Sequence, residues 1–350
     1  MKVFKYILIL LIVFLISGYF LLQNHFVQNR LFENTVRELF QTDEIFMNDA
    51  LSVAVCGSRA PLPSPNRAET CLLVQAGTSK FIIDSGRGSA DNLQRWRVDY
   101  SDLEAVILSH LHSDHISDLH EVQFQSWLGG RKTPLSVIGP IGTASTAQGF
   151  EQAFKLDSIY RSEHHGAILP IEAYGYDVVE FEGDAKLIFE NEDTRIIAFK
   201  VDHSPVDPSY AFKIEYKDRS IVLSGDTISL EVMTEYSKGV DVLFHDALAL
   251  PLIQEMERIS EELGNDVVSK VLFDIQNYHA NTIEVADIAK KAEVDLLVFY
   301  HLIPAPVNYI SEQMFLRGVD EIFSNYHVSE DGTLVSLPAG SDEIFIDLID

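Results

Sequence analysis

The stretch SHLHSDHISDL, residues 109–119, places His110, His112, Asp114 and His115 within six positions. It follows AVILS, residues 105–109, a continuous apolar run of the length and composition of a buried strand. In an extended segment, His110 and His112 point the same way, and the turn that follows can bring Asp114 and His115 back toward them. Imidazoles and carboxylates suit zinc, manganese or iron. A helix cap at Asp114 would explain one of these residues, so the stretch predicts a metal site at a strand end.

The N-terminus carries an apolar run, YILILLIVFLISGYFLL, residues 6–22, preceded by Lys2 and Lys5. Seventeen helical residues reach about 25 Å, enough for thin hydrocarbon. Bulky residues follow where a signal peptidase needs small ones, which favours an uncleaved anchor over a cleaved signal and secretion. Positive charge before the span predicts that the body lies on the periplasmic or extracellular side of the inner membrane.

Three segments are predicted from these patterns. Residues 1–23 form the anchor, residues 24–47 a juxtamembrane linker with an amphipathic helix, and residues 48–350 one α/β domain. The strands are expected near residues 51–56, 70–76, 80–86, 105–109, 134–139, 195–201, 210–216, 220–226, 241–246 and 295–301, with helices near 116–128, 266–279 and 282–292. Polar residues gather where strands end, which is where α/β folds place their sites.

The chain is strongly acidic, with a formal net charge of −27. No Lys/Arg cluster interrupts the sequence, so a polyanion would be repelled, and we expect no nucleic-acid partner. Cys56 and Cys71 flank a loop of turn residues, and in an exported chain they could pair. Sequence gives no distance between them, so the disulfide stays open.

His-x-His-x-Asp-His after a buried strand resembles the signature of the metallo-β-lactamase fold superfamily. FIIDSGRG (81–88), VDHS (201–204), SGDT (224–227) and FYHL (299–302) are similar, in the same order, to further motifs of its dinuclear hydrolases. The resemblance covers residues 50–335. It implies an αββα sandwich of two mixed sheets flanked by helices.

The resemblance also implies two divalent metal ions, zinc first, with manganese or iron as alternatives. One ion would have His110, His112 and His203 as ligands, the other Asp114, His115 and His301, and Asp226 would bridge them. Two such ions make a hydroxide available at neutral pH and bind both oxygens of a displacement. Asp114 is expected to act in catalysis as well as in metal binding, and Asp84 to support the ligands.

His245-Asp246 and His279 resemble paired motifs of the ribonuclease Z branch, which implies that His279 is a general acid oriented by Asp246. Asp replaces the usual Glu at 246, so its reach is in doubt. His164 and His165 are expected in a surface loop.

The ribonuclease Z branch carries a long arm, whereas here only KDRS, residues 217–220, separates two strands. The segment CGSRAPLPSPNRAETC with DSGRG looks more like exported arylsulfatase-like and phosphodiesterase-like enzymes, although Arg59 stands where glycine is usual. The sequence therefore predicts an anchored hydrolase of a small sulfate ester or phosphodiester, a small-molecule anionic substrate, with a homo-oligomer possible. The alternatives are a ribonuclease Z-like RNA 3′-processing endonuclease, a lactonase or β-lactamase-type hydrolase, and a non-catalytic metal-binding protein.

Overall fold

A computed structural model describes residues 2–41 and 45–349 of the chain. It divides into two compact units, residues 1–43 and 44–350. The predicted linker, residues 24–47, includes positions 42–44, which lie outside the described residues.

The first unit holds α1 (Lys2–Leu22) and α2 (His25–Leu39). Within α1, Val3–Leu22 has a mean hydropathy of 2.4 and is long and apolar enough to cross a membrane, a property that signal sequences share. In α2, Glu33 pairs with Arg30 one turn before it and with Arg37 one turn after it. The predicted apolar and amphipathic helices are therefore both present.

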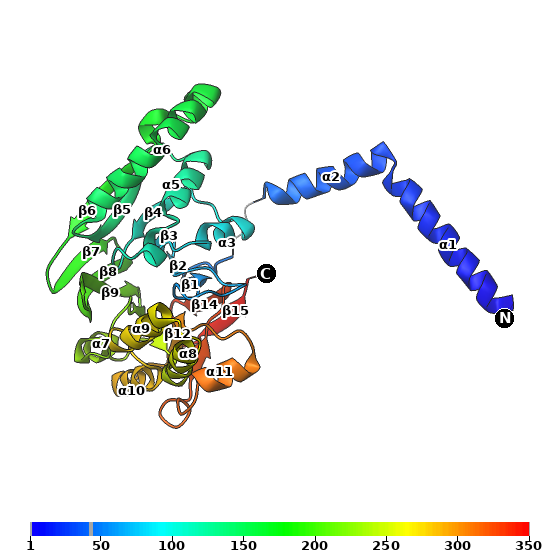
Figure 1. The fold of residues 1–350 in the computed structure, drawn as a ribbon. Coiled ribbons are helices and arrows are strands. Elements are labelled where there is room, and N and C mark those ends of the chain that lie inside the picture. Colours follow the sequence, from blue (N-terminus) through cyan, green and yellow to red (C-terminus); the bar gives the residue numbers. More distant parts are fainter. Residues whose placement is uncertain (1, 42–44, 350) are drawn as a thin grey trace. The chain divides into compact units, whose positions relative to one another are not determined.

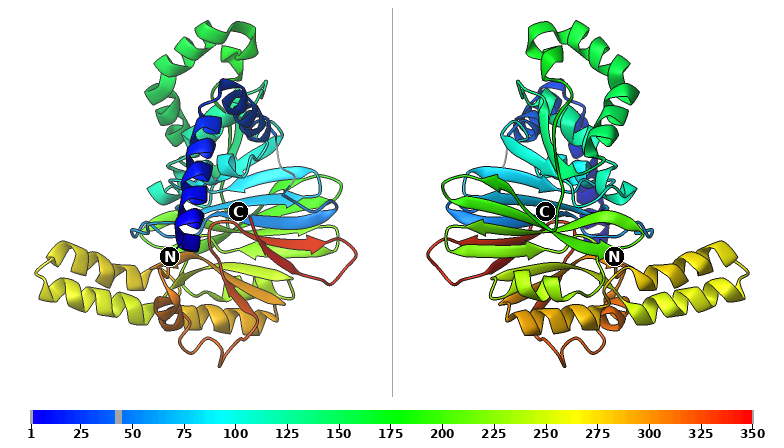
Figure 2. Two further views of the ribbon diagram at one scale, coloured as in Figure 1. Left: turned by 90° about the vertical axis from the view of Figure 1, so that its right-hand side faces the viewer. Right: turned by 90° about the vertical axis from the view of Figure 1, so that its left-hand side faces the viewer.

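The second unit contains two mixed sheets that face each other, as Figures 1 and 2 show. The eight-stranded sheet has the order β15 (Phe345–Leu348), β14 (Thr333–Pro338), β1 (Ala50–Gly57), β2 (Cys71–Ala76), β3 (Ser79–Ile83), β4 (Leu103–Ile107), β5 (Leu135–Pro140) and β6 (Tyr176–Phe181). The seven-stranded sheet has the order β13 (Tyr326–Val328), β12 (Leu296–Ile303), β11 (Val242–Leu248), β10 (Arg219–Leu223), β9 (Val206–Tyr216), β8 (Thr194–His203) and β7 (Ala185–Glu190).

Side chains alternate between two apolar layers along each central strand. In β1, Leu51 and Val53 join the core between the sheets, whereas Ala54 faces the helix side of its sheet. In β4, Ile107 points between the sheets and Val106 points to the helix side. Because both faces are covered, these strands are continuous apolar runs in the sequence. The arrangement is the predicted αββα sandwich.

Helices cover the outer face of each sheet (Figure 2). On the first sheet they are α3 (Ser89–Arg95), α4 (Ser113–Ile116), α5 (Leu119–Leu128) and α6 (Thr143–His165), and with the second sheet lie α7 (Glu231–Ser237), α10 (Thr282–Ala292) and α11 (Tyr309–Phe315). Helices α8 (Leu250–Glu262) and α9 (Asp266–Asp274) pair as a hairpin that projects from the body (Figure 2). The single helix expected over residues 116–128 is two, α4 and α5, because the chain turns at Ser117 and Asp118.

The expectation of a loop at His164 and His165 is wrong, because both lie in the last turn of α6. This helix buries only Thr143, Ala147 and Ser158, so its sequence has no apolar face that would reveal it. The short connection expected at residues 217–220 is confirmed. β9 and β10 pair as a hairpin, and only Lys217 and Asp218 lie between them.

Candidate metal centre

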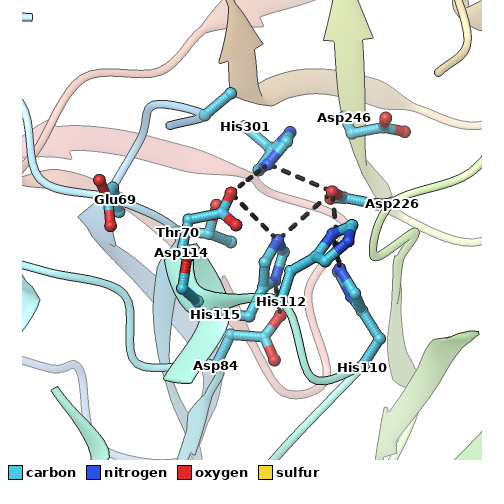
Figure 3. Close-up of polar contacts among 12 residues, drawn as sticks. Glu69, Thr70, Asp84, His110, His112, Asp114, His115, Asp226, Asp246 and His301 are labelled. Atoms are coloured by element: carbon cyan, nitrogen blue, oxygen red, sulfur yellow. Dashed lines mark hydrogen bonds and ion pairs between the residues drawn. The ribbon is translucent and has the colours of Figure 1, made fainter. Parts of the chain in front are cut away.

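The predicted site residues lie where strands of both sheets end. His110, His112, Asp114 and His115 follow β4, and His203 is the last residue of β8. Asp226 follows β10, and His301 lies near the end of β12. Figure 3 shows the imidazoles of His110, His112 and His115 turned toward the carboxylates of Asp114 and Asp226. The fold thus brings residues from positions 110 to 301 into one cluster that is buried except at His112.

Asp84 orients the start of this cluster from the end of β3. Its Oδ2 accepts hydrogen bonds from His115 Nδ1 at 2.8 Å and from Ser109 Oγ at 2.7 Å, and its Oδ1 accepts one from Ser109 N at 2.8 Å. Since the Ser109 hydroxyl donates to Asp84, it is left to accept from His110 Nδ1, 3.1 Å away. One carboxylate therefore leaves the Nε2 atoms of His110 and His115 free of their own protons, as metal ligands require.

A β-bulge aims His301 at the cluster. In the pairing of β11 with β12, Asp246 lies opposite Tyr300 and Ala247 lies opposite Leu302, so His301 has no partner. Its backbone has a φ of 43°, which is unfavourable for a non-glycine residue. Bulges next to active sites redirect side chains in this way, and residues with such backbone strain concentrate at functional sites.

Gly225 fixes the approach of Asp226. Its φ is 58°, and a Cβ atom there would lie 2.5 Å from the carbonyl oxygen of Tyr210. Only glycine tolerates both the backbone conformation and the contact. The turn SGDT therefore needs its glycine to bring the carboxylate of Asp226 between the histidines.

The first group of potential ligands has the spacing of a tetrahedral site. His112 Nδ1 lies 3.1 Å from His110 Nε2 and 3.4 Å from His203 Nε2. Asp226 Oδ2 lies 3.9 Å from His110 Nε2 and 3.7 Å from His203 Nε2. Ligand atoms about 2.1 Å from one zinc ion are about 3.4 Å apart. His203 donates Nδ1–H to the carbonyl of Tyr278 at 2.9 Å, so its Nε2 also faces the cluster as an acceptor.

The second group shares Asp226. His115 Nε2 and His301 Nε2 each lie 3.3 Å from Asp226 Oδ2, and they lie 3.6 and 3.3 Å from Asp114 Oδ2. His115 Nε2 and Asp226 Oδ1 are buried with no hydrogen-bond partner among the described residues. Buried polar atoms of native proteins rarely lack a partner, and a bound cation would provide one. The donor set therefore fits a metal pair.

The charges in the cluster are strongly coupled. Burial and the neighbouring His115 hold the pKa of His110 well below its usual range. Burial acts in the same direction on His115, but the carboxylates of Asp226 and Asp84 outweigh it and raise the pKa of that imidazole. Burial favours the neutral acid of Asp226, yet His301 and His115 hold its pKa well below the usual range. The carboxylate of Asp226 therefore stays ionised in the interior, because the imidazoles around it can carry positive charge.

His279 and Asp246 form a second buried feature at the edge of the cluster. His279 Nδ1 lies 2.8 Å from Asp246 Oδ2, and the His279 ring lies 4.9 Å from that of His203 and 5.4 Å from that of His301, measured between centroids. The carboxylate of Asp246 therefore reaches the imidazole, although its side chain is shorter than that of the usual Glu. Although burial opposes ionisation, His245 and His279 hold the pKa of Asp246 below its usual value.

The structure brings together all seven predicted ligands and the His279–Asp246 pair. His164 and His165 do not join them, since they lie exposed at the end of α6. The contributions of Ser109 and of the Tyr278 carbonyl were not predicted, because a serine beside a ligand and a backbone oxygen leave no pattern in a sequence. The open question of the cysteines also has an answer, since Cys56 and Cys71 form a disulfide.

The family emerges from comparison with known proteins. The family model for the anti-Pycsar protein Apyc1 matches residues 63–252. Ribonuclease Z of Mycobacterium bovis (strain BCG / Pasteur 1173P2) is 33% identical over 287 residues, which are 80% of this chain and 96% of that protein. Ribonuclease Z of Mycolicibacterium paratuberculosis is 31% identical over 83% of this chain and all of that protein. The chain belongs to the ribonuclease Z and Apyc1 family.

Solved structures agree with this family in fold. The metallo-β-lactamase-fold protein YhfI from Bacillus subtilis superposes with a TM-score of 0.61 at 22% identity, covering 82% of this chain and 100% of that one. The short form of human transfer-RNase Z gives a TM-score of 0.57 at 19% identity, covering 82% of this chain and 99% of that one. The predicted metallo-β-lactamase fold is therefore confirmed.

The prediction of a small anionic ester substrate and no nucleic-acid partner is wrong. Several relatives of this chain are named ribonuclease Z, and the alignments cover nearly the whole length of those relatives. The prediction rested on the short connection at residues 217–220, on the export signal and on net charge, and a net charge of −27 does not describe the local field at a site formed by distant segments.

Proposed function

We propose that the protein is a metal-dependent phosphodiesterase that cleaves RNA. The main support for this activity is the cluster around Asp226. Two groups of potential ligands lie there at metal-binding spacing, and the His279–Asp246 pair lies beside them. Relatives named ribonuclease Z, 33% identical over 80% of the chain, support RNA as the substrate class. A hydrolase of aryl sulfates has no comparable support.

The proposed ligands follow the two groups in the structure. His110, His112 and His203 would hold one divalent ion, Asp114, His115 and His301 would hold the other, and Asp226 would serve both groups. Imidazole with carboxylate favours zinc, with manganese or iron as alternatives. When bound, such a pair supplies a hydroxide at neutral pH and neutralises charge on the phosphoryl oxygens. Asp84 and the Tyr278 carbonyl keep His115 and His203 in the tautomer that presents Nε2.

His279 serves as the general acid in this proposal. Its Nδ1 is held by the Asp246 carboxylate at 2.8 Å, so the second proton of the imidazolium sits on Nε2. Donation of that proton to the leaving ribose oxygen avoids the release of an alkoxide, and an imidazole is suited to this at neutral pH. Asp246 orients the ring through this contact.

We also propose that the body is held at a membrane by α1 and works on its oxidising side. The apolar helix Val3–Leu22 follows the positive charge of Lys2, which predicts a cytoplasmic N-terminus. The disulfide between Cys56 and Cys71 supports this location, since such bonds persist outside the reducing cytosol. Protease protection of tagged spheroplasts tests the orientation, and a protected body would contradict it.

A substrate panel tests the proposed function. The zinc-loaded protein is incubated with labelled single-stranded RNA, with a transfer-RNA precursor and with p-nitrophenyl sulfate, and the variant Asp226→Ala is run alongside. We expect cleavage of at least one RNA, loss of that cleavage in the variant and after chelation, and no sulfate release. Hydrolysis of the sulfate ester with intact RNA would overturn the proposal.

A further inference from the structure

We propose that Arg67, Arg87 and Arg95 form a binding site for backbone phosphates of the substrate, beside the metal centre. This inference rests on the proposed function, because it names the part of the protein that holds RNA away from the cleaved bond. It also accounts for how an acidic chain binds a polyanion.

The observation is a cavity of about 470 Å³ on the surface of the second unit. Four arginines line it, Arg59, Arg67, Arg87 and Arg95, together with two acidic residues, Asp91 and Asp331. The whole chain has 26 Lys and Arg against 53 Asp and Glu. Basic residues therefore outnumber acidic residues in this cavity, whereas acidic residues outnumber basic ones in the whole chain. The arginines come from separate stretches, so no single stretch of sequence reveals the cavity.

Two of the charged groups in the cavity are already fully engaged. Arg59 is buried, and its guanidinium binds Glu69 at 3.1 Å, the carbonyl of Arg67 at 2.8 Å and that of Ala60 at 2.9 Å. The Asp331 carboxylate accepts bonds from the Ser58 and Ala68 amides, the Ser58 hydroxyl and the Asn92 amide group. Both side chains therefore build the walls of the cavity.

The other three arginines keep unused donors. Arg67 uses Nη1 to bind Ser58 Oγ and the Ser329 carbonyl, and Arg95 uses Nη1 to bind Asn92 Oδ1. Among the described residues neither forms an ion pair. Arg87 lies 3.3 Å from Glu69, which it shares with Arg59, and 69% of its side chain is exposed. A guanidinium has five donors and matches a phosphate in two-point contacts, so this set is suited to phosphates.

The segment that carries Arg87 contacts the backbone of the candidate ligands. Ser85 N donates to the His115 carbonyl at 2.7 Å, and a Cβ on Gly86 would lie 2.1 Å from the Asp114 carbonyl oxygen. Arg87 follows directly, so its Cα is at most about 11 Å from that of Asp84. In a B-form DNA duplex each strand carries one phosphate per about 3.4 Å of rise, so a nucleic-acid strand covers that length in a few nucleotides.

The side of the centre on which the cavity lies is also informative. Glu69, which pairs with Arg87, lies on the Asp114 side of the cluster, away from Asp246 (Figure 3). Because the leaving oxygen is assigned to the His279–Asp246 side, the arginines are placed to hold the fragment that keeps the cleaved phosphate.

The loop that carries Arg67 is rigidly held. The disulfide joins its two ends at Cys56 and Cys71, the Arg59–Glu69 ion pair crosses it, and Asp331 binds its backbone at Ala68. A binding group that is already ordered loses little entropy when the ligand arrives. Arg59, which stands where glycine is usual, therefore helps to shape the cavity.

The test is the salt dependence of RNA binding by the zinc-loaded protein. The probe is a fluorescent single-stranded RNA with phosphorothioate linkages, followed by anisotropy. Arg87→Gln/Arg95→Gln is compared with wild type and with Lys186→Gln/Lys238→Gln, which removes the same charge from exposed lysines elsewhere. We expect the slope of log K against log salt to flatten by about 1.4 in the arginine variant, since each lost contact removes about 0.7. The lysine variant should keep the wild-type slope.

Two results would overturn the site: an unchanged slope in the arginine variant, or an equal change of slope in the lysine variant. RNA cleavage with an unchanged slope would leave the proposed function standing and remove the arginine site. A flattened slope with no cleavage of any RNA would keep the site and remove the proposed function. Thermal melting of both variants serves as the folding control.

Discussion

Replacing Asp84 by Asn should weaken the second metal and leave the first nearly intact. The carboxylate accepts from His115 Nδ1 at 2.8 Å and from the Ser109 amide at 2.8 Å. Asn keeps the shape and one acceptor, which can still serve Ser109. Its amide group, however, would point a donor at the Nδ1–H of His115, so the ring must change its tautomer or turn away.

The expected size follows from similar substitutions around metal ligands, which weaken binding by about 10–100-fold. That corresponds to about 1.4–2.7 kcal/mol. The loss should fall on the site of Asp114, His115 and His301. The group of His110, His112 and His203 keeps its ligands, although His110 is linked to Asp84 through the Ser109 hydroxyl and should change slightly.

Zinc titration by calorimetry, starting from the chelated protein, measures both sites. The wild type should bind two ions, and Asp84→Asn should bind one tightly and one with reduced affinity. Asp241→Asn is the matched control, because it removes a carboxylate that binds Arg219 and the Ser220 amide, contacts that are separate from the cluster. Equal weakening of both ions, or two unchanged affinities, would refute the orienting role of Asp84.

Three further predictions concern other parts of the molecule. His279→Ala should lower kcat for RNA by about 10²–10⁴-fold with little change in KM, and Asp246→Asn should lower kcat to a smaller extent because the ring is less well oriented; an unaltered kcat in both variants would remove the pair from catalysis. Cys56→Ser/Cys71→Ser should lower the free energy of unfolding by about 3 kcal/mol, given the sequence separation of 15, and its melting temperature should no longer respond to reductant. Burial raises the pKa of Asp118 to about 6, so its protonation stabilises the folded state below pH 4 and this contribution is lost as pH rises through 6. Denaturant unfolding from pH 4 to 8 should show a smaller decline in stability for Asp118→Asn than for wild type, and parallel profiles would contradict that assignment.

Most ligand motifs were readable from the sequence because they lie at the end of an apolar strand, whereas His203 ends β8, which carries exposed polar residues. A strand buried on both faces is a continuous apolar run, and a histidine or aspartate directly after it is conspicuous. The family resemblance then ordered the distant motifs of His203, Asp226 and His301. The structure places these residues within a few ångströms of one another, as the two ligand groups require.

Some elements were hidden for an equally physical reason. Helix α6 buries few residues, so its sequence lacks the apolar stripe that reveals a surface helix. The bulge at His301 depends on how β11 and β12 pair, and strand pairing is not local. The hydrogen bonds that fix the tautomers of His115 and His203 come from Asp84 and from a backbone carbonyl.

The sequence by itself predicted the candidate metal ligands, because ligand type and strand-end position are local properties. Only the tertiary structure decided whether Asp246 reaches His279, whether Cys56 pairs with Cys71, and how charge is distributed around the site. Net charge is a sum over the chain, whereas the potential at a site depends on distance. Arg67, Arg87 and Arg95 are up to 28 positions apart in sequence and line one cavity after folding, so the inference from net charge failed where the folded protein gathers its cations.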